Sequence, residues 1–113
     1  MAENTIKLYL DKIGESPFQD WFEDLQDKKA RAAVLIRIGR VRLGNAGDWK
    51  PLEEGVRELR IHYGPGLRIY FAKEADDLVL LLCGGVKRTQ DRDIKRAKEY
   101  WHDYQIRKKS ANF

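Results

Sequence analysis

The residues best suited to chemistry lie between Gly55 and Arg88, where basic side chains alternate with apolar ones. Arg60 and Arg68 belong to two apolar-rich runs, and Lys87 and Arg88 follow a third run. Guanidinium and ammonium groups bind phosphate oxygens, and an arginine can bind two of them at once. If these cations converge, they would stabilise the negative charge that develops on a phosphoryl group during RNA cleavage. The alternative is that they are solvated side chains of ordinary strands.

Cleavage of RNA without a metal also needs a group that removes the proton of the ribose 2′-hydroxyl. Glu58 and His62 are the candidates beside the basic residues, because a carboxylate can act as a base and histidine exchanges protons near neutral pH. The alternative role of Glu58 is an ion pair with Arg60, Arg68 or a neighbouring lysine, and the alternative for His62 is a plain surface position. Tyr70 is a candidate for stacking on an RNA base, or for packing on Arg60 across a hairpin.

Positive charge is concentrated in two parts of the chain. The protein has 113 residues and a net charge of +4. Residues 31–73 carry nine basic and four acidic side chains, and residues 87–113 carry the same numbers. Arg92 and Lys95, in the second segment, are expected to extend an RNA-binding surface. Such patches attract polyanions, although an ordinary solubilising surface has the same composition.

Composition argues against several other classes of protein. Cys83 is the single cysteine and the two histidines are isolated, so we expect no disulfide, no metal site and no small-molecule cofactor. The N-terminus lacks the apolar segment of a signal peptide, and the longest apolar run, Leu78–Cys83, is too short to span a bilayer. The length favours a single domain, residues 1–113, and we expect it to be cytoplasmic.

The arginines are expected on a β-hairpin whose turn is Gly64-Pro65-Gly66. Apolar and polar residues alternate on both sides of this turn, and only an even register keeps both apolar sets on one face. A three-residue loop would give these pairs: Tyr63 with Leu67, Ile61 with Ile69, His62 with Arg68, and Arg60 with Tyr70. Arg60 and Arg68 would then share one open, polar face of the sheet.

The remaining elements predict an α+β fold in the order β-α-α-β-β-β-α, with a small, mainly antiparallel sheet and its helices packed on one side. Strands are expected at residues 6–10 and 78–83, the second covered on both faces and ended by Gly84-Gly85. Helices are expected from Ser16, with Gln19 completing a capping box, and over residues 27–43 and 89–107. Residues 44–55 are expected to form a loop.

Two segments resemble a known family. They are ELRIHYGPGLRIYF at residues 58–71 and VLLLCGGVKRTQDRDIKRA at residues 79–97. With the order of elements, they resemble the RelE/ParE toxin superfamily, in particular its branch of phage-derived and addiction module killer proteins, which is similar to HigB-type toxins. The resemblance extends roughly over residues 6–104. It implies a RelE-like fold and a type II toxin that is held inactive by a cognate antitoxin, commonly a helix-turn-helix protein.

The resemblance also implies two possible activities. RelE-like and HigB-like members cleave mRNA on the ribosome, whereas ParE-like members inhibit DNA gyrase. Arg68 matches the arginine that follows the hairpin turn in RelE-like enzymes, and Arg88 matches the arginine of their Lys-Arg pair after the last strand. Ile94 stands where those enzymes have a stacking tyrosine, and Glu58 and Arg60 fall near two of their lysines. The first hypothesis is therefore a metal-independent, ribosome-dependent mRNA endoribonuclease; the alternatives are a gyrase inhibitor and an inactive antitoxin-binding relative.

Overall fold

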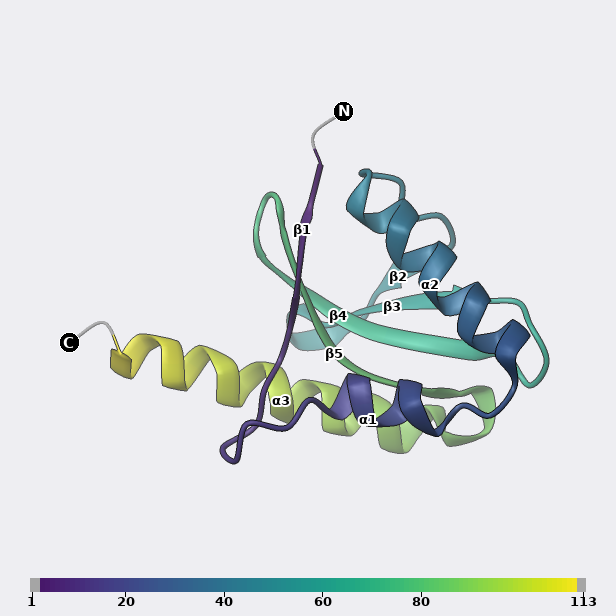
Figure 1. Ribbon diagram of the computed structural model, residues 1–113. Coiled ribbons are helices and arrows are strands. Elements are labelled where there is room, and N and C mark those ends of the chain that lie inside the picture. Colours follow the sequence, from purple (N-terminus) through teal and green to yellow (C-terminus); the bar gives the residue numbers. More distant parts are fainter. Residues whose placement is uncertain (1–2, 112–113) are drawn as a thin grey trace.

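Five strands form one mixed sheet with helices on both of its faces (Figure 1). The computed structural model describes residues 3–111. The strand order is β1-β5-β4-β3-β2, in which β1 runs parallel to β5 and the other neighbours are antiparallel. The strands are β1 Thr5–Leu8, β2 Trp49–Pro51, β3 Arg57–Ile61, β4 Leu67–Ala75 and β5 Leu78–Val86. The helices are α1 Pro17–Asp24, α2 Lys28–Arg42 and α3 Gln90–Ala111, with short 3₁₀ turns η1 Glu53–Gly55 and η2 Lys87–Thr89. The predicted α+β class is confirmed, and the arrangement is compatible with a RelE-like fold.

Helices α1 and α2 cover one face of the sheet. Ser16 caps α1, since its Oγ accepts a hydrogen bond from the Gln19 amide at 3.0 Å, and Pro17 occupies the first helical position. The Gln19 side chain donates to Glu23 and does not complete the predicted capping box. Asp27 caps α2 in the same way. The apolar core on this face consists of Phe18, Ala30, Val34, Val41, Leu59, Ile61, Leu67, Ile69, Phe71, Val79 and Leu81.

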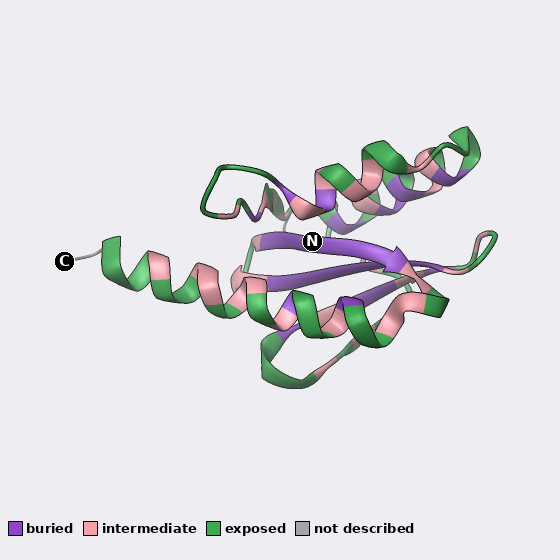
Figure 2. Ribbon diagram, turned by 90° about the horizontal axis from the view of Figure 1, so that it is seen from below, coloured by how far each residue is buried: buried purple, intermediate pink, exposed green. Residues whose placement is uncertain are grey.

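Helix α3 covers the opposite face, so the prediction that all helices pack on one side is wrong. Figure 2 shows buried strands between α3 and the N-terminal helices. Ala97 of α3 packs on a second core that also contains these buried residues: Tyr9, Val56, Tyr70, Ala72, Leu80, Leu82 and Cys83. Because β5 is apolar at successive positions, it has apolar side chains on both faces and needs a cover on each. Helix α3 provides the second cover.

Gly84 and Gly85 continue β5 instead of ending it. A Cβ atom added at Gly84 would overlap the Trp21 ring of α1, and one added at Gly85 would overlap the Asp93 carboxylate of α3. The two glycines therefore let the helices approach β5 closely from opposite faces. The strand continues to Val86, and η2 follows directly.

The predicted hairpin register is wrong by two residues, although the assignment of faces is right. Ile61 pairs with Leu67 and Arg60 with Arg68, so that residues 62–66 form a five-residue loop. An even shift leaves every side chain on its face, which is why the alternation could not distinguish the two registers. Residues 49–51, expected in a loop, form the short edge strand β2, which pairs with β3.

Candidate phosphate-binding face

Arg60 and Arg68 are direct cross-strand partners on the α3 side of the sheet. Their side chains therefore extend from neighbouring points on the same face. Arg68 is buried, with 8% of its surface exposed, and its Nε has no hydrogen-bond partner among the described residues. Two adjacent guanidinium groups repel each other, and a buried donor without an acceptor is unfavourable. An anion bound between them would remove both costs.

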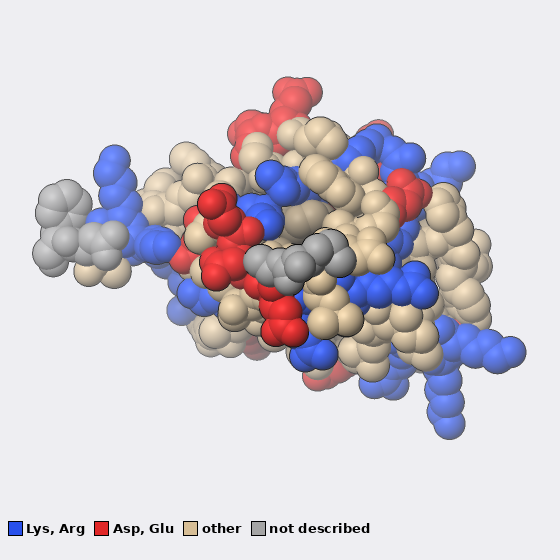
Figure 3. Space-filling model, turned by 90° about the horizontal axis from the view of Figure 1, so that it is seen from above, with Lys and Arg blue, Asp and Glu red and all other residues tan. Residues whose placement is uncertain are grey.

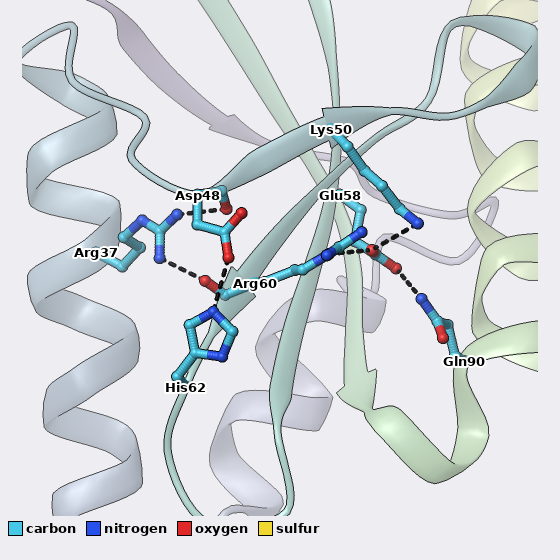
Figure 4. Close-up of polar contacts among 7 residues, drawn as sticks. All are labelled: Arg37, Asp48, Lys50, Glu58, Arg60, His62 and Gln90. Atoms are coloured by element: carbon cyan, nitrogen blue, oxygen red, sulfur yellow. Dashed lines mark hydrogen bonds and ion pairs between the residues drawn. The ribbon is translucent and has the colours of Figure 1, made fainter.

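Glu58 lies on the same face and is completely buried. Its Oε1 accepts a hydrogen bond from Arg60 Nε at 3.3 Å and lies 3.9 Å from Lys50 Nζ, and its Oε2 accepts one from Gln90 Nε2 at 2.7 Å (Figure 4). The contact with Arg60 is the ion pair that the sequence suggested as an alternative to a base. Both carboxylate oxygens are engaged, so the carboxylate would have to leave at least one of these partners to accept a proton from a substrate.

Tyr70 is the cross-strand partner of Glu58 and its ring is fully buried in the second core. Burial, followed by the nearby charge of Glu58, raises the pKa of the Tyr70 hydroxyl far above its ordinary value. Among the described residues, no group is placed to form a well-aligned hydrogen bond with this hydroxyl. A ring in this position is not accessible to an RNA base, which corrects the expectation that Tyr70 stacks on one. Ile94 packs against the same core.

His62 lies in the hairpin loop and not opposite Arg68, because of the register shift. Its side chain is 78% exposed, and its Nε2 lies 2.7 Å from Asp48 Oδ2. In Figure 4 the Arg60 side chain extends from β3 toward Glu58, away from His62. The hydrogen bond with His62 is the main reason that the pKa of Asp48 is lowered, against a smaller opposing effect of burial. Asp48 therefore remains an anion and orients the imidazole ring.

Arg37 of α2 also belongs to the site region, although it was not identified from the sequence. It is buried, and its guanidinium donates to the backbone oxygens of Ala46 at 2.8 Å, Arg60 at 2.6 Å and Asp48 at 2.6 Å. Burial lowers its pKa. These bonds fix the backbone of β3 at Arg60 against the loop before β2. Helical spacing could have indicated that Arg37 is buried, because position 37 lies three residues after Val34 and shares its buried helix face.

Lys87 approaches Arg68 at the hairpin tip. The Lys87 amide donates to the Gly66 carbonyl at 2.9 Å. A Cβ atom added at Gly66 would lie 3.4 Å from Lys87 Cβ and 3.7 Å from Arg68 Nη1, so both side chains flank this glycine. Lys87 is exposed and follows the end of β5, as expected.

The other predicted RNA-binding cations lie on η2 and the first turns of α3. Arg88 and Lys95 are exposed, whereas Arg92 Nε lies 3.5 Å from the buried Asp93 carboxylate. Within residues 3–111, neither Arg88 nor Lys95 lies within ion-pair distance of a carboxylate, and the same holds for Lys87. Lys87 therefore stands beside the partly buried pair of Arg60 and Arg68, and further exposed cations follow it along η2 and α3.

The described part of the chain has neither a cluster of metal-binding side chains nor a helix that could cross a membrane. No group of three or more histidine, cysteine, aspartate or glutamate side chains is arranged to hold a metal ion there. No described helix has the length and apolar character that crossing a bilayer requires. Cys83 is buried, and burial raises the pKa of its thiol to about 12, consistent with a core residue.

The fold and this face define a small α+β protein with a partly buried arginine pair. A family model described as "Phage derived protein Gp49-like (DUF891)" matches residues 20–102. An uncharacterized protein of Haemophilus influenzae is 47% identical over 81 residues, which cover 72% of this chain and 82% of that protein. The chain therefore belongs to the Gp49-like family of phage-derived proteins, a family commonly associated with addiction-module toxins.

Proposed function

We propose that the protein is the toxin of a type II toxin–antitoxin pair and that it cleaves mRNA on the ribosome. The family supports a toxin-like module. The observation that carries the proposal is the buried Arg68, which has an unpartnered Nε and a second arginine directly opposite. A phosphodiester has the negative charge and the acceptor oxygens that Arg68 lacks among the described residues.

In the proposed reaction, the ribose 2′-oxygen attacks the phosphorus atom and the bond to the 5′-oxygen breaks. Arg60 and Arg68 stabilise the charge that builds up on the non-bridging oxygens, and Lys87 and Arg88 hold the adjoining backbone. The products are a 2′,3′-cyclic phosphate and a 5′-hydroxyl end. We assign removal of the 2′-hydroxyl proton to Glu58, once phosphate has displaced it from Arg60, or to His62, which Asp48 orients. A proton must also reach the leaving 5′-oxygen.

The partners in this proposal are mRNA, the ribosome and a cognate antitoxin of the helix-turn-helix class. Exposed Lys87, Arg88 and Lys95, with Arg92, would contact phosphates around the cleavage site and on ribosomal RNA. Such contacts release counterions, so association with the ribosome should weaken as salt is raised.

A second candidate function, inhibition of DNA gyrase without nuclease activity, has its own supporting observations. Glu58 has both oxygens engaged, Tyr70 is fully buried, and Ile94 packs into the second core. The arginine face thus offers neither an unengaged carboxylate nor an exposed stacking ring at these positions. A toxin that only binds its target needs neither group.

The test is a reconstituted translation reaction with a defined mRNA, in which new 5′ ends are mapped by primer extension. We expect discrete ends only while the message is translated, and none with Arg68→Met. Arg57→Met is the matched control, because Arg57 lies on the same strand as Arg60 but stacks on Trp49 at the other face. Intact mRNA, together with loss of gyrase supercoiling in a parallel reaction, would instead establish the second candidate.

A further inference from the structure

Helix α2 has an apolar face on its outer side as well as on its inner side. Its inner side packs on the sheet through Ala30, Val34 and Val41. At 100° per residue, another apolar set falls together on the opposite side. This set, the outer stripe, consists of Ala32, Leu35, Ile36, Gly39 and Leu43. Leu35, Ile36 and Leu43 are 57%, 58% and 55% exposed, so the chain itself leaves the outer stripe largely uncovered.

Basic residues border the outer stripe along both sides. By the same helical spacing, Lys29 and Arg40 lie along one side, and Arg31 and Arg42 along the other. No acidic residue occurs anywhere in α2. Figure 3 views the side of the molecule that carries the start of β1, where basic side chains surround part of the uncharged surface and acidic side chains gather near the N-terminal end of β1. A partner that covers the stripe therefore meets positive charge at its margins.

Gly39 lies in the middle of the outer stripe. A Cβ atom added there would meet nothing within 4 Å, so no contact within the described chain requires a glycine. Glycine inside a helix costs about 1 kcal/mol relative to alanine. Ala32, two turns earlier, is also small. Small residues along one line of a helix allow the backbone of a second helix to come close.

A groove runs beside the outer stripe, between α2 and β1. It has a volume of about 500 Å³ and is lined by Leu35, Ile38, Gly39 and Arg42 of α2, by Thr5 and Ile6 of β1, and by Glu3 and Asn4 just before β1. A helix of a binding partner can place some of its side chains in this groove, and the side chains of its neighbouring turns can then cover the outer stripe. Two copies of α2 are poor partners for each other, because their contact would bring the basic borders of both together.

We propose that the outer stripe binds an amphipathic helix of another protein, one whose apolar positions recur at intervals of three and four residues and are flanked by aspartate and glutamate. The apolar side chains of this helix cover Leu35, Ile36 and Leu43, and its acidic flanks pair with the basic borders. The inference concerns a different face from the arginine pair, so it does not depend on RNA cleavage.

The test is selection from a displayed library of 20-residue peptides with randomised apolar and polar positions, using the full chain as bait. We expect the enriched peptides to have apolar residues at helical spacing with acidic flanks. We also expect the Leu35→Ser/Ile36→Ser variant to bind the best peptide, made synthetically, at least about tenfold more weakly.

Matched variants distinguish an acidic amphipathic helix from other partners of the outer stripe. Ile13→Ser/Ile106→Ser removes two other exposed apolar residues, 77% and 51% exposed, and should leave affinity unchanged. Arg40→Glu/Arg42→Glu should weaken binding and remove most of its salt dependence. Both positions are exposed, and an unchanged melting temperature of each variant verifies the fold. The proposal is overturned if no such peptide is enriched or if the enriched peptides are basic or extended. It is also overturned if sedimentation analysis shows that the chain dimerises through the outer stripe.

Discussion

The two faces of the sheet differ in what they bury. Under α1 and α2 the sheet contributes only apolar side chains to the core, and the one buried arginine of α2, Arg37, donates three hydrogen bonds to backbone oxygens. Under α3 the sheet buries Tyr70, Leu80 and Leu82, but also Glu58 and Arg68, while α3 itself contributes the buried Asp93. A core does not need charged groups, and burying them costs free energy unless they are well paired. Arg68, whose Nε lacks a partner, marks the α3 face as the one shaped by something other than stability.

The largest effect is expected on the apolar face, at Leu59. Leu59→Ala should lower the free energy of unfolding by about 2–5 kcal/mol, because it leaves a cavity in a fully buried core. Leu35→Ala removes the same atoms from an exposed position and should change stability by less than about 0.5 kcal/mol. Urea denaturation of both variants measures the difference. Equal effects would mean that the two leucines are not placed as described.

A smaller loss is expected where α3 meets the sheet, at Gly85. Gly85→Ala should cost about 1–3 kcal/mol, because the new methyl group overlaps the Asp93 carboxylate and forces α3 away from β5. Gly39→Ala is the opposite control, because it adds a methyl group in open space on a helix and should stabilise the chain by up to about 1 kcal/mol. Melting temperatures that change in the same direction would refute the close contact.

A loss of about 1–2 kcal/mol is expected for Tyr9→Phe, which removes a hydrogen bond to a carboxylate at the α3 face. The Tyr9 hydroxyl donates to Asp103 Oδ2 at 2.6 Å. Burial, followed by this hydrogen bond, raises the pKa of Tyr9 from 10.0 to about 12, and the bond lowers the pKa of Asp103 from 3.8.

These shifts define a pH window for the Tyr9 contribution. The lowered pKa of Asp103 stabilises the fold above pH 3.8, and that part is lost as the pH falls through the folded-state value. The raised pKa of Tyr9 stabilises the fold below pH 10.0, and that part is lost as the pH rises toward 12. The stability gap between wild type and Tyr9→Phe should therefore be widest near neutral pH. A gap that is independent of pH would contradict the contact.

Alternation along the strands was enough to predict the faces of β3 and β4. It could not fix their register, because the observed pairing of Arg60 with Arg68 and the expected pairing with Tyr70 differ by an even shift. The cover over the second face was predictable in principle. The unbroken apolar run of β5 implied two covered faces, which conflicts with helices on one side only. Strand β2 was missed because three residues ending in Pro51 carry too little pattern.

The sequence predicted which residues form the candidate site, but not which of their side chains are buried. Arg60, Arg68 and Lys87 were identified from the sequence, and the structure brings them to one end of the sheet. The polar positions of the alternating strands are buried only where α3 covers them. The apolar stripe of α3 does not indicate which face of the sheet the helix covers. For that reason the sequence predicted that Tyr70 and Glu58 are accessible to RNA. Arg37 could not be assigned its role because its acceptors are backbone carbonyls, which no residue type indicates.

A small effect on stability is expected at Arg68, although it is nearly as inaccessible as the core residues. Arg68→Met should leave the free energy of unfolding within about 1 kcal/mol of wild type or raise it, because methionine fills similar space and removes a buried donor without an acceptor. Glu58 keeps its contacts with Arg60 and Gln90. Urea denaturation provides the value, and a loss comparable to that of Leu59→Ala would show that Arg68 is a structural residue.

Growth after induction of Arg68→Met, in cells without antitoxin and at a level of folded protein matched to wild type, tests the central claim most directly. If the buried arginine pair exists to hold a phosphodiester, wild type and Arg57→Met arrest growth and Arg68→Met does not. Full growth arrest by Arg68→Met would contradict the account, because the α3 face would then act without the cation that distinguishes it.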